Sequence, residues 1–108
     1  MITLRDLIAA YPTVSWSDHL HLLIRWHVCP MCQISGHLPS EGLIIDLGCG
    51  HGLFTQLAAR QMPERTVIGI DLDARKIAVA RQLSFSNLNF LTRKTATIDV
   101  FRLLGVKN

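Results

Sequence analysis

The sequence has few charged residues, no long hydrophobic run and no internal repeat. Charged residues make up 18% of its 108 positions and the formal net charge is +3, whereas hydrophobic residues make up 49%. This balance excludes an intrinsically disordered chain, which needs high charge and little hydrophobicity. No apolar segment approaches the roughly 20 residues that a transmembrane helix needs, so we expect no membrane association. We expect a single domain with a modest core.

Three further features bear on location and partners. The start of the chain, Met1 to Asp6, lacks the basic region and apolar core of a signal peptide, which predicts a cytoplasmic protein. The 3 cysteines are odd in number, which in a cytosolic chain indicates free thiols. Basic residues are spread out, with pairs only at Arg75–Lys76 and Arg93–Lys94. This spread favours a solvated surface over a nucleic-acid-binding one, without excluding the latter.

A single C-x-x-C pair, Cys29 and Cys32, suggests a metal or redox site. A structural zinc site needs four ligands, and no second cysteine pair exists. The histidines that remain as further ligands are His19, His21, His27 and His37. A thioredoxin-like role would place the motif at a strand–helix junction, whereas here it follows a predicted helix. We therefore expect no metal site, and the spacing supports no catalytic triad.

What the sequence does contain is a strand–loop–helix signal. Leu43 to Ile45 is a continuous apolar run, typical of a strand buried on both faces in a parallel sheet. Glycines follow at alternate positions, Gly48, Gly50 and Gly52. Apolar residues then recur at helical spacing from Leu53. In open α/β sheets, ligands bind beyond the carboxyl ends of the strands, so the loop is a candidate binding site.

The spacing of the glycines distinguishes two kinds of binding loop. A dinucleotide fingerprint, G-x-G-x-x-G, would require glycine where Leu53 stands. The observed pattern is D-x-G-x-G-x-G, beginning at Asp46. A second apolar strand, Val67 to Ile70, ends at Asp71, near the distance of about 20 residues expected for a ribose-binding carboxylate.

Together these features resemble motif I and the following acidic residue of the class I, Rossmann-like S-adenosylmethionine-dependent methyltransferases, over roughly residues 43–91. The resemblance implies S-adenosylmethionine as cofactor. It implies that Asp71 binds the ribose hydroxyls, Leu72 packs on adenine and Asp46 supports the methionine end. The implied cofactor-binding residues are Asp46, Gly48, Cys49, Gly50, Gly52, Asp71 and Leu72. Cys49 is expected to be a small apolar loop residue rather than a nucleophile, and His51 either meets the cofactor or is exposed.

Two departures from the family pattern limit the resemblance. The family often has an acidic residue near adenine just past its third strand, and here Lys94 stands roughly at that place. The family sheet has seven strands in the order 3-2-1-4-5-7-6, of which this sequence supplies three and part of a fourth. We expect the segments that usually hold the acceptor to be absent, so the resemblance assigns no acceptor and no catalytic residue.

The leading function is therefore the cofactor-binding half of a methyltransferase, and whether this chain is itself an enzyme stays open. The alternative is a non-catalytic methyltransferase-like remnant or interaction module. A dinucleotide-binding domain is a third reading, against which Leu53 argues.

The predicted fold is α/β: a partial Rossmann-like parallel sheet, strand order 3-2-1, flanked by helices. Residues 1–40 are predicted to be a helical N-terminal preface and residues 41–108 a truncated cofactor-binding domain, together forming one compact unit.

In the preface, Thr3 caps a helix over Leu4–Ala10. A second helix from Ser15 or Ser17 to Val28 is expected to bury a stripe composed of Leu20, Leu23, Ile24 and His27, with Trp16 also packed. Residues 33–42 are expected to be a loop.

Two helices and two strands are predicted after the first strand and its loop. The expected elements are a helix over residues 52–61, a strand over 66–70, a helix over 74–83 capped by Asp73, and a strand over 88–92. The second of these helices is expected to turn Ile77, Ala78 and Ala80 toward the sheet. The tail, Ile98 to Val106, fits either a helix or a strand.

The strand order has one consequence for assembly. Strand one is central in the family sheet but would lie at an edge here, with apolar residues on both faces, which is a pairing hazard. We therefore expect the isolated chain to self-associate and to have little or no methyl-transfer activity by itself.

Overall fold

The computed structural model describes residues 1–92. Lys94 and the tail over residues 98–106 lie outside this range. The helices and strands are, in chain order, α1 (Leu4–Ala9), α2 (Trp16–Val28), α3 (Met31–Gly36), β1 (Gly42–Leu47), α4 (Leu53–Gln61), β2 (Arg65–Asp71), α5 (Ala74–Ala80) and β3 (Leu88–Thr92). None of these helices combines the length and hydropathy that a bilayer crossing needs.

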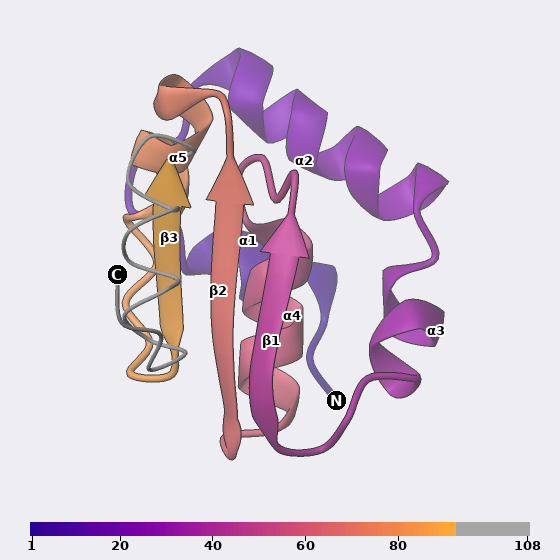
Figure 1. Ribbon diagram of the computed structural model, residues 1–108. Helices are drawn as coiled ribbons and strands as arrows, with labels where there is room; N and C mark the ends of the chain where they lie inside the picture. The colour runs from indigo at the N-terminus through magenta and orange to yellow at the C-terminus, as the bar shows by residue number, and fades with distance from the viewer. Residues whose placement is uncertain (93–108) are drawn as a thin grey trace, which may run out of the picture.

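The three strands form a parallel sheet with β2 in the middle, in the order β1-β2-β3. This confirms the predicted α/β class and the strand order 3-2-1. In the register, Val67 of β2 pairs with Ile44 of β1 and with Leu88 of β3. Helices α1, α4 and α5 lie on one face of the sheet, and α2 runs across the end to which the strands point (Figure 1).

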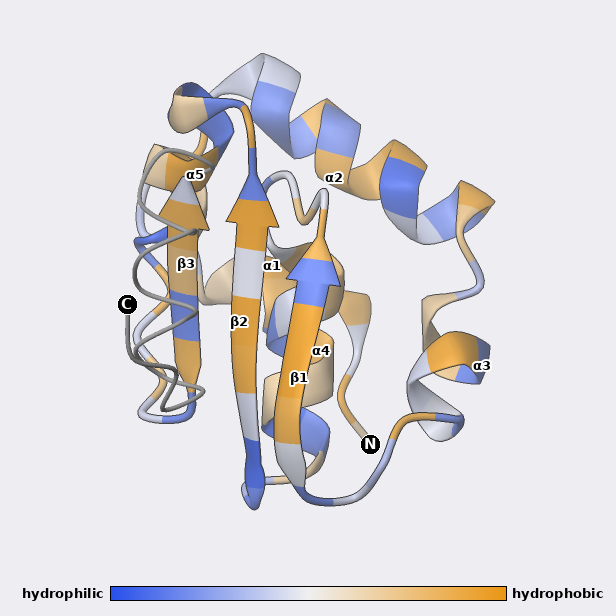
Figure 2. Cartoon of the chain, viewed as in Figure 1, coloured by the Kyte–Doolittle hydropathy of each residue, from blue (hydrophilic) through white to orange (hydrophobic). Residues whose placement is uncertain are grey.

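Apolar side chains explain why the central strand and α4 pack together. The strands are hydrophobic along most of their length (Figure 2). Val67 of β2 packs against Ala58 and Ala59 of α4, and all three residues are buried. Burying a large aliphatic side chain stabilises a fold by about 1.5–3 kcal/mol, so this contact helps to hold α4 against the sheet.

Two predicted helix caps are confirmed. Thr3 Oγ1 accepts a hydrogen bond of 3.2 Å from the Asp6 amide, and Asp6 Oδ2 accepts one of 2.8 Å from the Thr3 amide, which together form a capping box. Asp73 Oδ1 accepts hydrogen bonds from the amides of Arg75 and Lys76 at the start of α5. Each side chain occupies donors that the first turn of a helix leaves without a helical partner.

The predicted loop over residues 33–42 is wrong in its first part, because residues 31–36 form α3. Pro30 was predicted to stop the second helix, and α2 does end just before it, at Val28 with Cys29 as its C-cap. Proline also suits the start of a helix, since its missing N–H would have no partner there. Pro30 is the N-cap of α3 and so separates two helices.

The predicted buried stripe of α2 is also wrong. Leu20 and Ile24 are 52% and 54% exposed, and Trp16 is 84% exposed. The residues that α2 buries are Asp18 and Leu22. Both stripes have helical spacing, and the sequence analysis chose the more apolar one. Burial followed the other stripe because Asp18 has a partner in the core, described below.

Smaller corrections concern α5 and β1. Helix α5 ends at Ala80 rather than at Leu83, and Ala78 is exposed while Ile77 and Ala80 are buried. Strand β1 is not buried on both faces, because Leu43 and Ile45 are 39% and 37% exposed.

Polar contacts fasten the first 40 residues to the sheet. The buried Arg65 guanidinium donates to four backbone carbonyls, those of Ser35, Leu38, Pro39 and Ala58. Gln56 of α4 donates from Nε2 to the Leu7 carbonyl of α1 at 3.0 Å. These hydrogen bonds hold the first 40 residues against the sheet and α4, because moving the two apart would break them and leave the buried donors unpaired.

Candidate functional site

The glycine loop folds over the carboxyl end of β2. Gly48, Gly50 and Gly52 have φ angles of 75°, 57° and 82°, the left-handed region that favours glycine. The amides of Gly48 and Cys49 both donate to the Ile70 carbonyl, at 2.7 and 3.1 Å. The loop is therefore held against the last residues of β2, directly beside Asp71.

Asp71 is tied to the loop by its carboxylate. Its Oδ2 accepts a 2.8 Å hydrogen bond from the Gly50 amide, and its Oδ1 accepts one of 2.8 Å from the Asp73 amide. Partial burial opposes ionisation, but the hydrogen bonds from the backbone of Asp73 and Gly50 outweigh it and lower the pKa of Asp71. Each oxygen accepts one of these bonds and keeps a second lone pair for a ligand.

Asp46 lies in β1, two residues before the first glycine of the loop. Its Oδ2 accepts a 2.8 Å hydrogen bond from Thr55 Oγ1, so α4 fixes the orientation of the carboxyl group. Burial raises the pKa of Asp46, while the Thr55 bond and the charge of Arg25 act in the opposite direction.

Cys49 is buried beneath the loop, with a 4% exposed side chain. Burial, followed by the charges of Asp46 and Asp71, raises the pKa of its thiol to about 12. The thiol is therefore protonated at neutral pH, and a protonated thiol is a poor nucleophile.

Phe90 of β3 packs under the same loop, a role that the sequence analysis missed. A β-carbon on Gly52 would lie 2.5 Å from Phe90 Cζ, and one on Gly69 would lie 2.7 Å from Phe90 Cδ1. Glycine at both positions lets the ring of Phe90 fill the space between β2 and the start of α4. An isolated glycine inside a strand, such as Gly69, is a signal of close approach that would have indicated this contact.

The glycine loop is also joined to α2 through His51. The ring Nε2 of His51 lies 2.9 Å from Asp18 Oδ1, and both side chains are buried. The His51 carbonyl accepts a 2.8 Å hydrogen bond from the Tyr11 hydroxyl. His51 is thus neither exposed nor free. The sequence analysis missed Asp18, because the contact spans 33 residues and no local pattern marks it.

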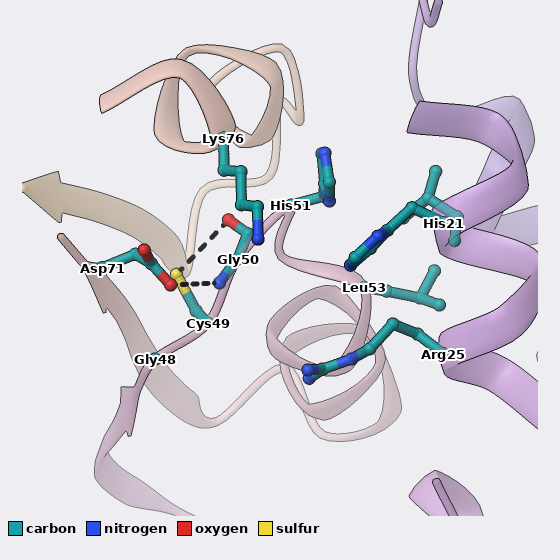
Figure 3. A pocket seen from close by; sticks show the side chains of 10 residues that line it. His21, Arg25, Gly48, Cys49, Gly50, His51, Leu53, Asp71 and Lys76 are labelled. Carbon is teal, nitrogen blue, oxygen red and sulfur yellow. Dashed lines mark hydrogen bonds between the residues drawn. The ribbon is translucent and has the colours of Figure 1, made fainter. Parts of the chain in front are cut away.

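Two hollows lie next to the loop, and Gly48 and Asp71 line both of them. The first hollow is polar and is closed on one side by α2 (Figure 3). Besides Asp71, its polar side chains come from three segments, and they are His21 and Arg25 of α2, His51 of the loop and Lys76 of α5. The second hollow is apolar and contains Leu47, Ile70 and Leu72. Leu47 and Leu72 are 76% and 71% exposed, so both present an apolar surface beside the loop.

Of the residues predicted to form the site, the structure places most around one loop. Gly48 and Asp71 line both hollows, Cys49 and Gly50 line the polar one, and Leu72 lines the apolar one. Asp46 and Gly52 support the loop from beneath, through Thr55 and Phe90.

The C-x-x-C pair lies away from this loop, between α2 and α3. Cys29 and Cys32 are free thiols. Within residues 1–92, no group of three His, Cys, Asp or Glu side chains is arranged to hold a metal ion.

Comparisons with known proteins agree with this geometry. The family model described as "Methyltransferase domain" matches residues 39–101, more than half of the chain. The chain is 36% identical over 75 residues to "Ribosomal RNA small subunit methyltransferase G" of Psychrobacter arcticus, which covers 69% of this chain and 31% of that protein. It is 40% identical over 80 residues to "Trans-aconitate 2-methyltransferase" of Deinococcus radiodurans, with coverages of 71% and 31%. The chain thus spans about a third of the length of these curated relatives.

Solved structures share the fold. A TehB-like SAM-dependent methyltransferase from Corynebacterium glutamicum superimposes with a TM-score of 0.51 at 20% identity, over 70% of this chain and 43% of that one. The plantazolicin methyltransferase BpumL, in complex with SAH, gives a TM-score of 0.53 at 19% identity, over 82% of this chain and 38% of that one. The family match, on this shared fold and with the glycine loop and Asp71 in contact, means that the chain belongs to the methyltransferase domain family.

Proposed function

We propose that this chain binds S-adenosylmethionine as the cofactor-binding part of a methyltransferase. The observation that carries the proposal is the pair of unlike hollows that are both lined by Asp71. S-adenosylmethionine has a charged amino-acid end, a ribose diol in the middle and a flat base at the other end. A polar hollow, a carboxylate and an apolar hollow in that order match these three parts.

Each site residue would bind a different part of the cofactor. Asp71 would accept hydrogen bonds from the ribose hydroxyls with the lone pairs that Gly50 and Asp73 leave free. Leu72 would pack on the base, and Asp46 would face the amino-acid end. A β-carbon at Gly48 or Gly50 would meet no atom within 4 Å, so the space above the loop is open for a ligand.

The cofactor supplies a methyl group on a positively charged sulfonium, which is already activated for transfer. The residues of the chain then need only hold and orient the cofactor, because proximity and alignment account for much of such a rate enhancement. This division of labour is consistent with a site rich in binding groups whose only thiol is protonated at neutral pH.

Replacing Asp71 tests the proposal. Asp71→Ala is expected to weaken binding of S-adenosylhomocysteine at least tenfold, because hydrogen bonds to a charged acceptor contribute about 1.5–3 kcal/mol each. The measurement is isothermal titration calorimetry on the purified chain. The matched control is Asp73→Ala, which removes the cap of α5 two residues away and should leave the affinity within about threefold of wild type.

The same titration distinguishes the alternatives. S-adenosylmethionine and S-adenosylhomocysteine should bind, and NAD should not, since Leu53 stands where a dinucleotide loop needs glycine. Equal affinity in Asp71→Ala would remove Asp71 from the site. Binding of NAD alone would replace the proposal with a dinucleotide-binding domain.

The acceptor and catalysis by this chain alone are not part of the proposal. The relatives are named for acceptors as different as ribosomal RNA and trans-aconitate, so their names select no acceptor for this chain. The chain spans about a third of these relatives' length, so the activity of the whole relatives is not assigned to it, and a non-catalytic interaction module is the second candidate. The free cysteines of the described part suit a reducing compartment, and we propose the cytoplasm.

We also propose that copies of the chain associate through β1. Among the described strands, β1 pairs with β2 alone, so half of its backbone donors and acceptors face outward. Leu43, Ile45 and Leu47 are 39%, 37% and 76% exposed on one side of the strand. A second β1 pairing with the first would satisfy the backbone groups and bury these side chains together.

Light scattering coupled to size-exclusion chromatography tests this association over a dilution series. Wild type is expected to elute as a dimer or larger species at high concentration and to dissociate on dilution. Ile45→Lys, which places a charge on the apolar side of the edge strand, should shift the equilibrium toward monomer by at least tenfold in concentration. A wild-type monomer at every concentration would contradict the proposal.

A further inference from the structure

We propose that Asp18 of α2 is a positioning residue for the glycine loop. Through His51 it holds the second half of the loop in place, and with it the Gly50 amide that donates to Asp71. The inference rests on the proposed function and deepens it, because it adds a residue outside the glycine motif on which cofactor affinity depends. Asp18 does not line the polar hollow, so it acts through His51 rather than by touching the ligand.

The first observation is that the glycine loop is attached at two places to different parts of the fold. Its first half is attached to β2, because the amides of Gly48 and Cys49 donate to the Ile70 carbonyl. Its second half is attached to the N-terminal part of the chain through His51. Gly50 lies between the two attachments with a φ of 57°. Since glycine has wide conformational freedom, the direction of its amide depends on both attachments.

The second observation is that the contact between His51 and Asp18 is shielded from water. The ring Nε2 of His51 lies 2.9 Å from Asp18 Oδ1, and the two side chains are only 4% and 7% exposed. The His51 carbonyl is held as well, by the hydrogen bond from the Tyr11 hydroxyl. Water has little access to replace either partner, so the contact constrains His51 more than an exposed one would.

The charge of Asp18 fixes the direction of this hydrogen bond. Burial opposes ionisation of Asp18, but its hydrogen bonds with Ser15 and His51 and the charges of His51 and Arg75 outweigh burial and lower its pKa. The carboxylate is therefore ionised at neutral pH and can only accept, so His51 Nε2 carries the donated hydrogen. Asp18 thus sets both the tautomer and the orientation of the His51 ring.

The third observation concerns the face that α2 presents to the protein. Helix α2 buries Asp18 and Leu22, while Leu20 and Ile24 are 52% and 54% exposed. Burying a carboxylate costs more than burying a leucine, and a buried charged contact contributes little net stability once that cost is counted. The contact between Asp18 and His51 is therefore better suited to fixing the position of the loop than to stabilising the fold.

Calorimetry with S-adenosylhomocysteine on Asp18 variants is the first test. Asp18→Ala is expected to weaken binding about tenfold, whereas Asp18→Asn, whose Oδ1 can still accept from His51, should stay within about threefold of wild type. The matched control is Arg75→Gln, which removes the other contact of Asp18, at 3.2 Å. The Arg75 side chain is 69% exposed, and exposed ion pairs contribute little, so this variant should also stay within about threefold. Unchanged affinity in Asp18→Ala would overturn the inference.

Amide hydrogen exchange on the free protein separates positioning from a general loss of stability. In Asp18→Ala the Gly50 amide should exchange about tenfold faster than in wild type, because its bond to Asp71 forms less often. The buried Val67 amide of β2, which donates to the Asn87 carbonyl, should exchange at the wild-type rate. If both amides accelerate equally, or if Gly50 does not accelerate, Asp18 is not a positioning residue.

Two further provisions keep the test decisive. If Asp18→Ala does not fold, Asp18→Leu fills the space without offering an acceptor and should show the same loss of affinity and the same faster exchange at Gly50. If wild type binds neither S-adenosylmethionine nor S-adenosylhomocysteine, the proposed function fails, and the exchange of the Gly50 amide alone decides whether Asp18 positions the loop.

Discussion

Among glycine-to-alanine substitutions in the glycine loop, Gly52→Ala is expected to destabilise the fold most. The new β-carbon would lie 2.5 Å from Phe90 Cζ and 3.3 Å from Ala80 Cβ, in a residue that is buried. Gly52 also has a φ of +82°, where a β-carbon meets the backbone. The left-handed conformation costs about 1–2 kcal/mol and overpacking about 1–3 kcal/mol, so we expect a loss of about 2–4 kcal/mol.

Thermal unfolding followed by circular dichroism measures this loss, which for a domain of this size corresponds to a Tm lower by about 10 °C or more. Gly36→Ala is the control, because a β-carbon at the end of α3 meets no atom within 4 Å and its φ is not positive. The control should match wild type or exceed it by up to about 1 kcal/mol. If the two variants unfolded at the same temperature, the contact with Phe90 would not constrain residue 52.

Gly50→Val is expected to abolish cofactor binding, with an affinity for S-adenosylhomocysteine lower by about a hundredfold or more. A β-carbon at Gly50 meets open space in the free protein, so the side chain would occupy the volume proposed for the ligand. Its φ of +57° also disfavours a β-branched residue, which would shift the amide that donates to Asp71. Calorimetry on a variant first shown to be folded by circular dichroism measures the effect.

The neighbouring substitution Cys49→Ala tests whether Gly50→Val acts by filling the space of the ligand or by disturbing the loop as a whole. Cys49 is buried beneath the loop and its thiol is protonated at neutral pH, so its loss should cost about 1 kcal/mol of stability. Cofactor affinity should stay within about threefold of wild type. If Cys49→Ala lost binding while Gly50→Val kept it, the roles assigned to the two residues would be reversed.

Much of the fold was predictable from local signals. The apolar runs of the three strands, the capping residues Thr3 and Asp73, and the helix after the glycine loop all appear where the sequence placed them. Such signals succeed because strand pairing, capping and helical spacing depend on residues close together in the chain. The spacing from Gly48 to Asp71 likewise predicted their meeting, since parallel neighbouring strands end at the same edge of a sheet.

The errors fell where local signals were ambiguous. Pro30 is compatible with both a helix end and a helix start, and the sequence analysis recognised only the first. In α2, two stripes share helical spacing, and the more apolar one was chosen over the stripe that contains Asp18. Hydrophobicity alone favours the first stripe, but Asp18 becomes a buried residue once His51 is in reach.

The sequence by itself determined the parallel strand order, the glycine loop and the acidic residue beside it, because each depends on spacing within about 25 residues of chain. Only the tertiary structure decided which face of α2 meets the loop, that Phe90 lies beneath Gly52, and that Arg25 points into the polar hollow. These contacts join segments distant in the chain, and burial selects them by the partners available in the folded core. No local pattern encodes that choice, since the same stripe of residues is buried or exposed according to what faces it.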